Sequence, residues 1–441
     1  MLSDYFELKK RGTNVKTEIV AGITTFATMS YILVVQSSMM ADAGMNPKGV
    51  MITTALMSGI FTLVSAFYSK VPFALAPGMG TNAIMAYSIV ATGQATWQVG
   101  VGMFVVTGAI LALLTLFKVR EDMVRVMPKN IKIGIGAAVG IFLARMAVVN
   151  GGYVKEDFSG LGDFSQPAVQ LALIGLIITL VLNFIRVDIN GKKYQVRGAY
   201  LISIVLTTVI GIFMGVVKVP PNLVSFNLSS IGDVAFKADV KGVFKLANLP
   251  TLMFLLLSDF FSTMGTSLGL AGKAGMLDED GNFEGISRVF LTDAIGTSVG
   301  GIFGITNLQT YVESAAGIEA GGRTGLTAVS TAIMFLLSMF FAPLFLIIPN
   351  AATAPVLIMI GASMMEGLKD VDFTTLEWTP LAFMLLTTAF TGDFVLGVAL
   401  GVIVSAVISV VQYVFTMDRS KMPELGTLIM ALVMSIKFFV D

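Results

Sequence analysis

The chain has 441 residues, of which 55% are hydrophobic and 13% are charged, and its formal net charge is +0. Soluble domains carry about 25% charged residues, so much of this chain must face lipid, and nothing in the charge balance indicates a nucleic-acid partner. Cysteine and histidine do not occur in the sequence. Disulfides, thiolate or imidazole metal ligands and cysteine or imidazole catalysis are therefore excluded, and we expect no metal and no cofactor.

The predicted elements begin with a cytoplasmic segment at residues 1–17, which contains Lys9, Lys10, Arg11 and Lys16. A cleaved signal peptide is disfavoured because the apolar run that follows is long and Thr-rich. Apolar runs of about 20 residues then predict transmembrane helices. In the first half they lie at 18–40, 50–68, 72–92, 99–117, 131–149, 166–185 and 198–217. In the second half they lie at 251–272, 286–304, 308–320, 325–348, 351–368, 378–391 and 394–416.

This pattern predicts an all-α polytopic membrane protein of about 14 spans. We expect a first seven-span repeat at 18–217, an extracytoplasmic connection at 218–250, a second seven-span repeat at 251–416 and a cytoplasmic segment at 417–441. An apolar stretch at 425–440 is short for a span and is typical of an interfacial helix. With the N-terminus inside, most of the 28 Lys and Arg residues lie in cytoplasmic segments, which favours a multi-pass plasma-membrane protein with both termini cytoplasmic.

Short matches indicate that the two halves are repeats. Phe26–Ser30 matches Phe261–Gly265 at an offset of 235, and the same offset places Ala76–Gly80 over Tyr311–Ala315. Seven spans separate the halves, and this odd number would invert one repeat relative to the other. Inverted repeats are a transporter architecture, with the substrate site at mid-depth between interrupted helices.

Two matching segments are predicted to be broken. The first, at 73–83, contains Pro77 and Gly78, which disfavour a continuous helix. The second, at 304–317, has a polar, β-branched first half. Half-helices beginning near Asn82 and Ser314 would direct their N–H groups at a ligand. An ordinary kinked span is the alternative for a Pro-Gly pair alone.

Carboxylates within apolar stretches are the candidate functional groups. A charge at mid-bilayer costs about 2.5–3.5 kcal/mol on insertion scales, so Glu313 is expected to have a function. On a helix, Asp259 shares one polar stripe with Ser262, Thr263 and Thr266. For Asp293, a structural role through pairing with neighbouring groups and a role in ion coupling are equally compatible with the sequence.

Four motifs resemble the AzgA-type purine permeases of the nucleobase–cation symporter group, which share the uracil and xanthine permease fold. They are Pro77–Ala83, Lys273–Asp278, Thr292–Thr297 and Tyr311–Gly317 continuing through Gly321–Ala328. Two positions depart from the family pattern: Ser262 stands where many members have a second acidic residue, and Asn307-Leu-Gln309 replaces a Ser/Thr-rich run.

The resemblance implies core and gate domains and proton-coupled uptake of hypoxanthine, guanine or adenine. Glu313 and Asp259 would contact the purine, and Asn82 would support them. Thr263, Ser314 and Gly80 complete the expected substrate site, while Asp259 and Asp293 are the expected coupling residues. Burial disfavours a charged carboxylate, so Asp259 could act as the proton switch while Glu313 holds the substrate.

Three functions remain open from the sequence. The first is a purine importer with a purine nucleobase, a coupling cation (H⁺ before Na⁺) and membrane lipid as partners, and with a homodimer left open. An anion carrier of the same fold would need a neutral or cationic site, which two carboxylates at depth oppose. The third is a membrane-embedded enzyme, which the absence of the usual catalytic residues from this chain disfavours.

Overall fold

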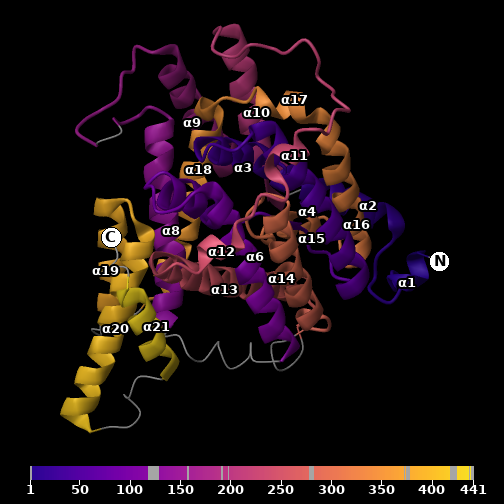
Figure 1. Cartoon of the computed structure of the whole chain (residues 1–441). Coiled ribbons are helices and arrows are strands. Elements are labelled where there is room, and N and C mark those ends of the chain that lie inside the picture. Colours follow the sequence, from indigo (N-terminus) through magenta and orange to yellow (C-terminus); the bar gives the residue numbers. More distant parts are fainter. Residues whose placement is uncertain are drawn as a thin grey trace.

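The described part of the chain forms a bundle of helices (Figure 1) and contains two short two-stranded sheets. The computed structural model describes residues 2–117, 129–155, 158–189, 192–196, 198–277, 283–371, 373, 378–417, 425–436 and 438. Nine helices in these ranges are long and apolar enough to cross a membrane, and two shorter apolar helices accompany them. Each expected span has a counterpart there, which agrees with the predicted helical membrane architecture.

One set of packed helices, here the core group, draws on both halves of the chain. Its elements from the first half are α2 (Val15–Met29), α3 (Tyr31–Asp42), α4 (Pro47–Ser69), β1 (Leu75–Ala76), α5 (Met79–Ala83), a wider π-helical segment (Ile84–Val90) and α6 (Trp97–Leu116). Those from the second half are α13 (Leu249–Lys273), α14 (Ile286–Ile302), β4 (Gln309–Thr310), α15 (Ser314–Glu319), α16 (Gly325–Ser338) and α17 (Ala342–Leu346). The helices α1 (Leu2–Tyr5), α11 (Ile231–Val234) and α12 (Val240–Val243) are peripheral.

The second set, here the gate group, also combines both halves. It consists of α8 (Lys129–Asn150), α9 (Pro167–Phe184), α10 (Ala199–Phe213), α18 (Asn350–Met364), α19 (Thr379–Thr391) and α20 (Phe394–Thr416). In Figure 1, α19 and α20 lie at the left edge, while α2 and α16 of the core group lie at the right. The two groups correspond to the expected core and gate domains. The boundaries of the two repeats remain predictions.

Polar side chains mark several helix starts. The side chain of Asn14 accepts a hydrogen bond from the Thr17 N–H at 3.0 Å and begins α2. Asn46 caps α4 in the same way, and Pro47 occupies the first turn, where its missing N–H costs nothing. Asp393 accepts from the Leu396 N–H at 2.9 Å at the start of α20. These short signals separate apolar runs that would otherwise be hard to divide.

The outer surface of the gate group is apolar. Phe213 of α10, Phe390 of α19 and Phe415 of α20 are at least 80% exposed. Exposed apolar faces of this kind suit a lipid environment. By contrast, Phe104 and Phe335 of the core group and Phe142 of α8 are fully buried in one continuous interior.

Three local details differ from the sequence-based expectations. The first half-helix, α5, begins at Met79 and not near Asn82, because the extended backbone ends at Gly78. An antiparallel hairpin of β2 (Arg186–Ile189) and β3 (Lys192–Gln195) lies between α9 and α10, where no strands were expected. The C-terminal α21 (Leu425–Ser435) packs against α13 and α20, and its Met430 and Met434 are buried.

Candidate functional site

The two predicted breaks lie side by side and pair with each other. Strands β1 and β4 are antiparallel, with Leu75 opposite Thr310 and Ala76 opposite Gln309. The Tyr311 N–H donates to the Ala74 carbonyl at 2.9 Å. Extended backbone at membrane depth is tolerated only where its polar groups find partners or line a cavity. Each break therefore supplies hydrogen-bond partners that the other needs.

A cavity of about 610 Å³ opens beside these strands, between the core group and the gate group. This volume lies in the range of about 300–1,000 Å³ typical of small-molecule sites. The core group lines it with Thr28, Tyr31, Gly78–Thr81, residues of α13, and residues of the 309–319 segment. The gate group contributes Ile135, Gly136 and Val139 of α8, Asn183, Val196, Gly198–Tyr200, and Ile360, Ser363 and Met364 of α18. Side chains from both groups must therefore meet any ligand held there.

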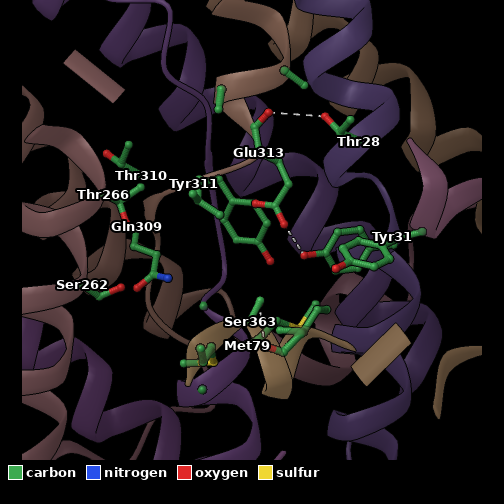
Figure 2. Close-up of a pocket in the computed structure, with 18 of the residues that line it drawn as sticks. Thr28, Tyr31, Met79, Ser262, Thr266, Gln309, Thr310, Tyr311, Glu313 and Ser363 are labelled. Atoms are coloured by element: carbon green, nitrogen blue, oxygen red, sulfur yellow. Dashed lines mark hydrogen bonds between the residues drawn. The ribbon is translucent and has the colours of Figure 1, made fainter. Parts of the chain in front are cut away.

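Glu313 lies in this cavity wall, immediately before α15 (Figure 2). Its Oε1 accepts a hydrogen bond of 2.5 Å from the Tyr31 hydroxyl, and its main-chain carbonyl accepts one of 3.4 Å from Thr28. Its Oε2 is buried and has no hydrogen-bond partner in the described part of the chain. Burying an acceptor without a partner is unfavourable, so this oxygen is suited to an N–H group of a ligand.

Asn307 holds the two breaks and α13 together. Its Oδ1 accepts from the Gly78 N–H at 3.1 Å and from the Thr81 hydroxyl. Its Nδ2 donates to Oδ1 of Asp259 at 2.5 Å and to Oε1 of Gln309 at 3.1 Å. The Asn307 side chain thus connects the start of α5, α13 and β4.

The structure places Asp259 behind the cavity wall. Asp259 is 2% exposed, and Oδ2 accepts a bond of 3.4 Å from the Thr297 hydroxyl of α14. Thr263, one turn further along, is also buried and does not line the cavity. The polar face of α13 that does line it consists of Ser258, Ser262 and Thr266. Direct contact of Asp259 and Thr263 with a substrate remains a prediction that this arrangement does not support.

The other expected site residues fall into two classes. Gly80 lines the cavity, and a Cβ there would lie 2.6 Å from Cγ1 of Val139 on α8. The second class does not line the cavity and instead forms hydrogen bonds with the two interrupted segments; it consists of Asn82, Ser314 and Asp293. Asn82 Oδ1 accepts from the Thr306 hydroxyl at 2.5 Å. The hydroxyl of Ser314 accepts from the Ala74 N–H at 3.0 Å, and Asp293 Oδ2 accepts from the Thr310 N–H at 3.1 Å.

Several cavity residues were not expected from the sequence. Tyr31 is 1% exposed and reads in the sequence as part of an apolar helix, although it follows the repeated Phe26–Ser30 segment directly. Its ring meets that of Tyr200 edge-on, with the centroids 5.7 Å apart. The sequence marks Gln309 only as a departure from a family pattern, whereas in the structure its side chain faces the cavity (Figure 2).

The sequence matches a known family over most of its length. The model of the Permease family that groups xanthine and uracil permeases matches residues 16–410. The chain belongs to this permease family. Relatives of this chain are named as permeases or nucleobase transporters and not as enzymes, and these names confirm the expected AzgA-type resemblance.

Two curated relatives illustrate the similarity. Adenine permease AdeQ of Escherichia coli is 36% identical over 91% of this chain and 88% of its own length. Guanine/hypoxanthine permease PbuO of Bacillus subtilis is 33% identical over 99% of both chains. Among solved structures, the transmembrane domain of the cyanobacterial bicarbonate transporter BicA matches 88% of this permease with a TM-score of 0.63 and 16% identity. That likeness shows the shared transporter fold.

Proposed function

We propose that this permease is a secondary active transporter that imports purine nucleobases, namely hypoxanthine, guanine or adenine, together with protons. The observation that carries the proposal is that Glu313 lines the cavity and has a buried Oε2 without a partner among the described residues. A purine presents N–H donors on a planar edge, and a carboxylate accepts such donors in short, charge-assisted bonds. The names of the curated relatives support the same class of substrate.

The other walls of the cavity suit a planar heterocycle. Tyr31, Tyr200 and Tyr311 provide aromatic surface next to Glu313, while Thr28, Ser262 and Thr266 provide hydroxyl groups. Small-molecule sites commonly combine apolar and aromatic walls with a few polar groups that fix the orientation of the ligand. The site thus combines one strong acceptor with surfaces that a purine ring can contact.

Transport follows in this proposal from movement of the core group against the gate group. The cavity lies between the two groups, so a relative displacement would open it to either side of the membrane in turn. Asp259 carries the coupling proton, with Asp293 as the second coupling residue, and both contact the breaks from within the core group. In this proposal both termini lie in the cytoplasm, and the protein is located in the plasma membrane.

An anion carrier is less well supported. The carboxylate of Glu313 in the cavity wall would repel an anion, and the fold that this chain shares with a bicarbonate transporter does not set the charge of the site. Glu313 therefore favours a neutral ligand that donates hydrogen bonds.

The proposal is tested by uptake of radiolabelled hypoxanthine, guanine and adenine into cells that lack their own purine transporters. We expect uptake of at least one base, a strong reduction by a protonophore and no requirement for Na⁺. An Asp259→Asn variant is expected to exchange bound purine across the membrane but to lose accumulation driven by a proton gradient. Sulfate uptake without any purine uptake would overturn the proposal.

A further inference from the structure

Gln309 presents an amide group to the cavity in a defined orientation. Its Oε1 accepts the hydrogen bond from Nδ2 of Asn307 at 3.1 Å. Its Nε2 has no hydrogen-bond partner within the described ranges. In Figure 2 the nitrogen points toward the open centre of the pocket, and the oxygen points away from it. The side chain therefore offers N–H donors to a ligand.

This orientation is set by a main-chain group. The N–H of Gly78 can only donate, so the Asn307 atom that faces it must be the oxygen. The Nδ2 of Asn307 must then face Asp259 and Gln309, and the carboxylate of Asp259 is a matching acceptor. Since Nδ2 can only donate, Gln309 must turn its oxygen toward Asn307 and its nitrogen toward the cavity.

The packing around Gly78 also depends on this arrangement. A Cβ atom at Gly78 would lie 2.9–3.0 Å from Cδ, Nε2 and Oε1 of Gln309. Such distances are too short for unstrained contacts, so the absence of a side chain at this position leaves room for the amide. β4 holds the main chain of Gln309 opposite Ala76, which limits how far the side chain can move.

We propose that Gln309 is a specificity-determining residue that donates a hydrogen bond to an acceptor on the substrate, and that Asn307 and Asp259 are positioning residues for its amide. The substrate edge then pairs an N–H group with Glu313 and a carbonyl or ring nitrogen with Gln309. This inference rests on the proposed function, because it names the second polar contact of the same purine site. Ligands that present hydrogen-bond donors but no acceptor to Gln309 would bind more weakly.

The inference is tested by titration calorimetry on the purified full-length protein with hypoxanthine and three analogues. The 3-deaza and 7-deaza analogues each lack one ring acceptor, and the 6-thio analogue weakens the carbonyl acceptor. In the unsubstituted protein, one analogue is expected to bind about fivefold or more weakly than hypoxanthine. In Gln309→Leu that penalty should disappear for the same analogue only, since its missing acceptor is the partner of Gln309.

Two further variants sharpen the experiment. Gln309→Glu replaces the donor with an acceptor of the same shape and is expected to weaken hypoxanthine binding by about tenfold or more. Asn307→Asp replaces the Nδ2 donor that faces Gln309 with an acceptor, so it should turn the Gln309 amide over and abolish the analogue-specific penalty. Gln412→Leu on α20, away from the cavity, is the matched control and should bind like the unsubstituted protein.

Failure of the inference and failure of the proposed function give different results. If the unsubstituted protein binds no purine, the proposed function is wrong. If it binds hypoxanthine but every analogue carries the same penalty with and without Gln309, the role of Gln309 is wrong while the function stands. Thermal unfolding of each variant establishes that a lost penalty reflects binding and not loss of the folded state.

Discussion

Replacing Glu313 by Gln tests the proposed substrate contact most directly. The Tyr31 hydroxyl would still donate to the remaining oxygen, so the new amide nitrogen would take the place of Oε2. A ligand N–H would then face a donor in place of a charged acceptor. Hydrogen bonds to charged groups contribute about 1.5–3 kcal/mol, which corresponds to a roughly 10- to 150-fold increase in Kd.

The measurement is calorimetric titration of hypoxanthine into the purified protein at one fixed pH. Glu366→Gln is a matched control, because Glu366 is exposed and forms its ion pair with Lys369 at 2.6 Å. The control should leave Kd unchanged, since exposed ion pairs contribute little. If Glu313→Gln unfolds at the same temperature as the unsubstituted protein and binds hypoxanthine within about twofold of it, the role assigned to Glu313 is refuted.

Three further predictions concern the support of this site. Tyr31→Phe removes the donor to Glu313 and should weaken hypoxanthine binding in the same calorimetric assay by about fivefold, or about 1 kcal/mol; unchanged binding would contradict a positioning role. Gly317→Ala would bring a Cβ to 2.1 Å from a hydroxyl of α2 and should lower the free energy of unfolding by about 1–3 kcal/mol. Gly269→Ala, where a Cβ would meet open space, is the control and should be neutral or stabilising. If thermal unfolding ranks the two variants the other way, the packing argument is refuted. Glu18→Gln should lower the unfolding temperature strongly, with a loss on the order of 3 kcal/mol, because its carboxylate accepts five hydrogen bonds from residues 323–327; an unchanged temperature would show that this buried contact is dispensable.

The breaks and Glu313 could be predicted from the sequence because each violates a local rule. Pro77 and Gly78 interrupt an apolar run that would otherwise continue as a helix. Glu313 adds a carboxylate where burial is costly. The partition into core and gate groups came only from the family resemblance, since it depends on contacts between distant parts of the chain.

The face of α13 was harder to predict. Asp259, Ser262, Thr263 and Thr266 form one broad polar stripe, and a helical repeat does not tell which edge of that stripe faces the cavity. Rotating α13 about its axis by the angle of one residue places Ser258 at the cavity in place of Asp259. The packing of α13 against α6, α14 and β4 fixes that rotation, and none of those contacts is local in sequence.

The pairing of β1 with β4 has a consequence for the two halves of the gene product. Thr62 and Asp293 bond to some main-chain groups of these strands, but the strands pair with each other, and Asn307 adds a side-chain link to Gly78. A half produced on its own would leave that edge open within the bilayer, where no water can replace the missing partner. The two halves are thus mutually dependent for assembly, and a split protein should regain its fold only when both pieces are made together.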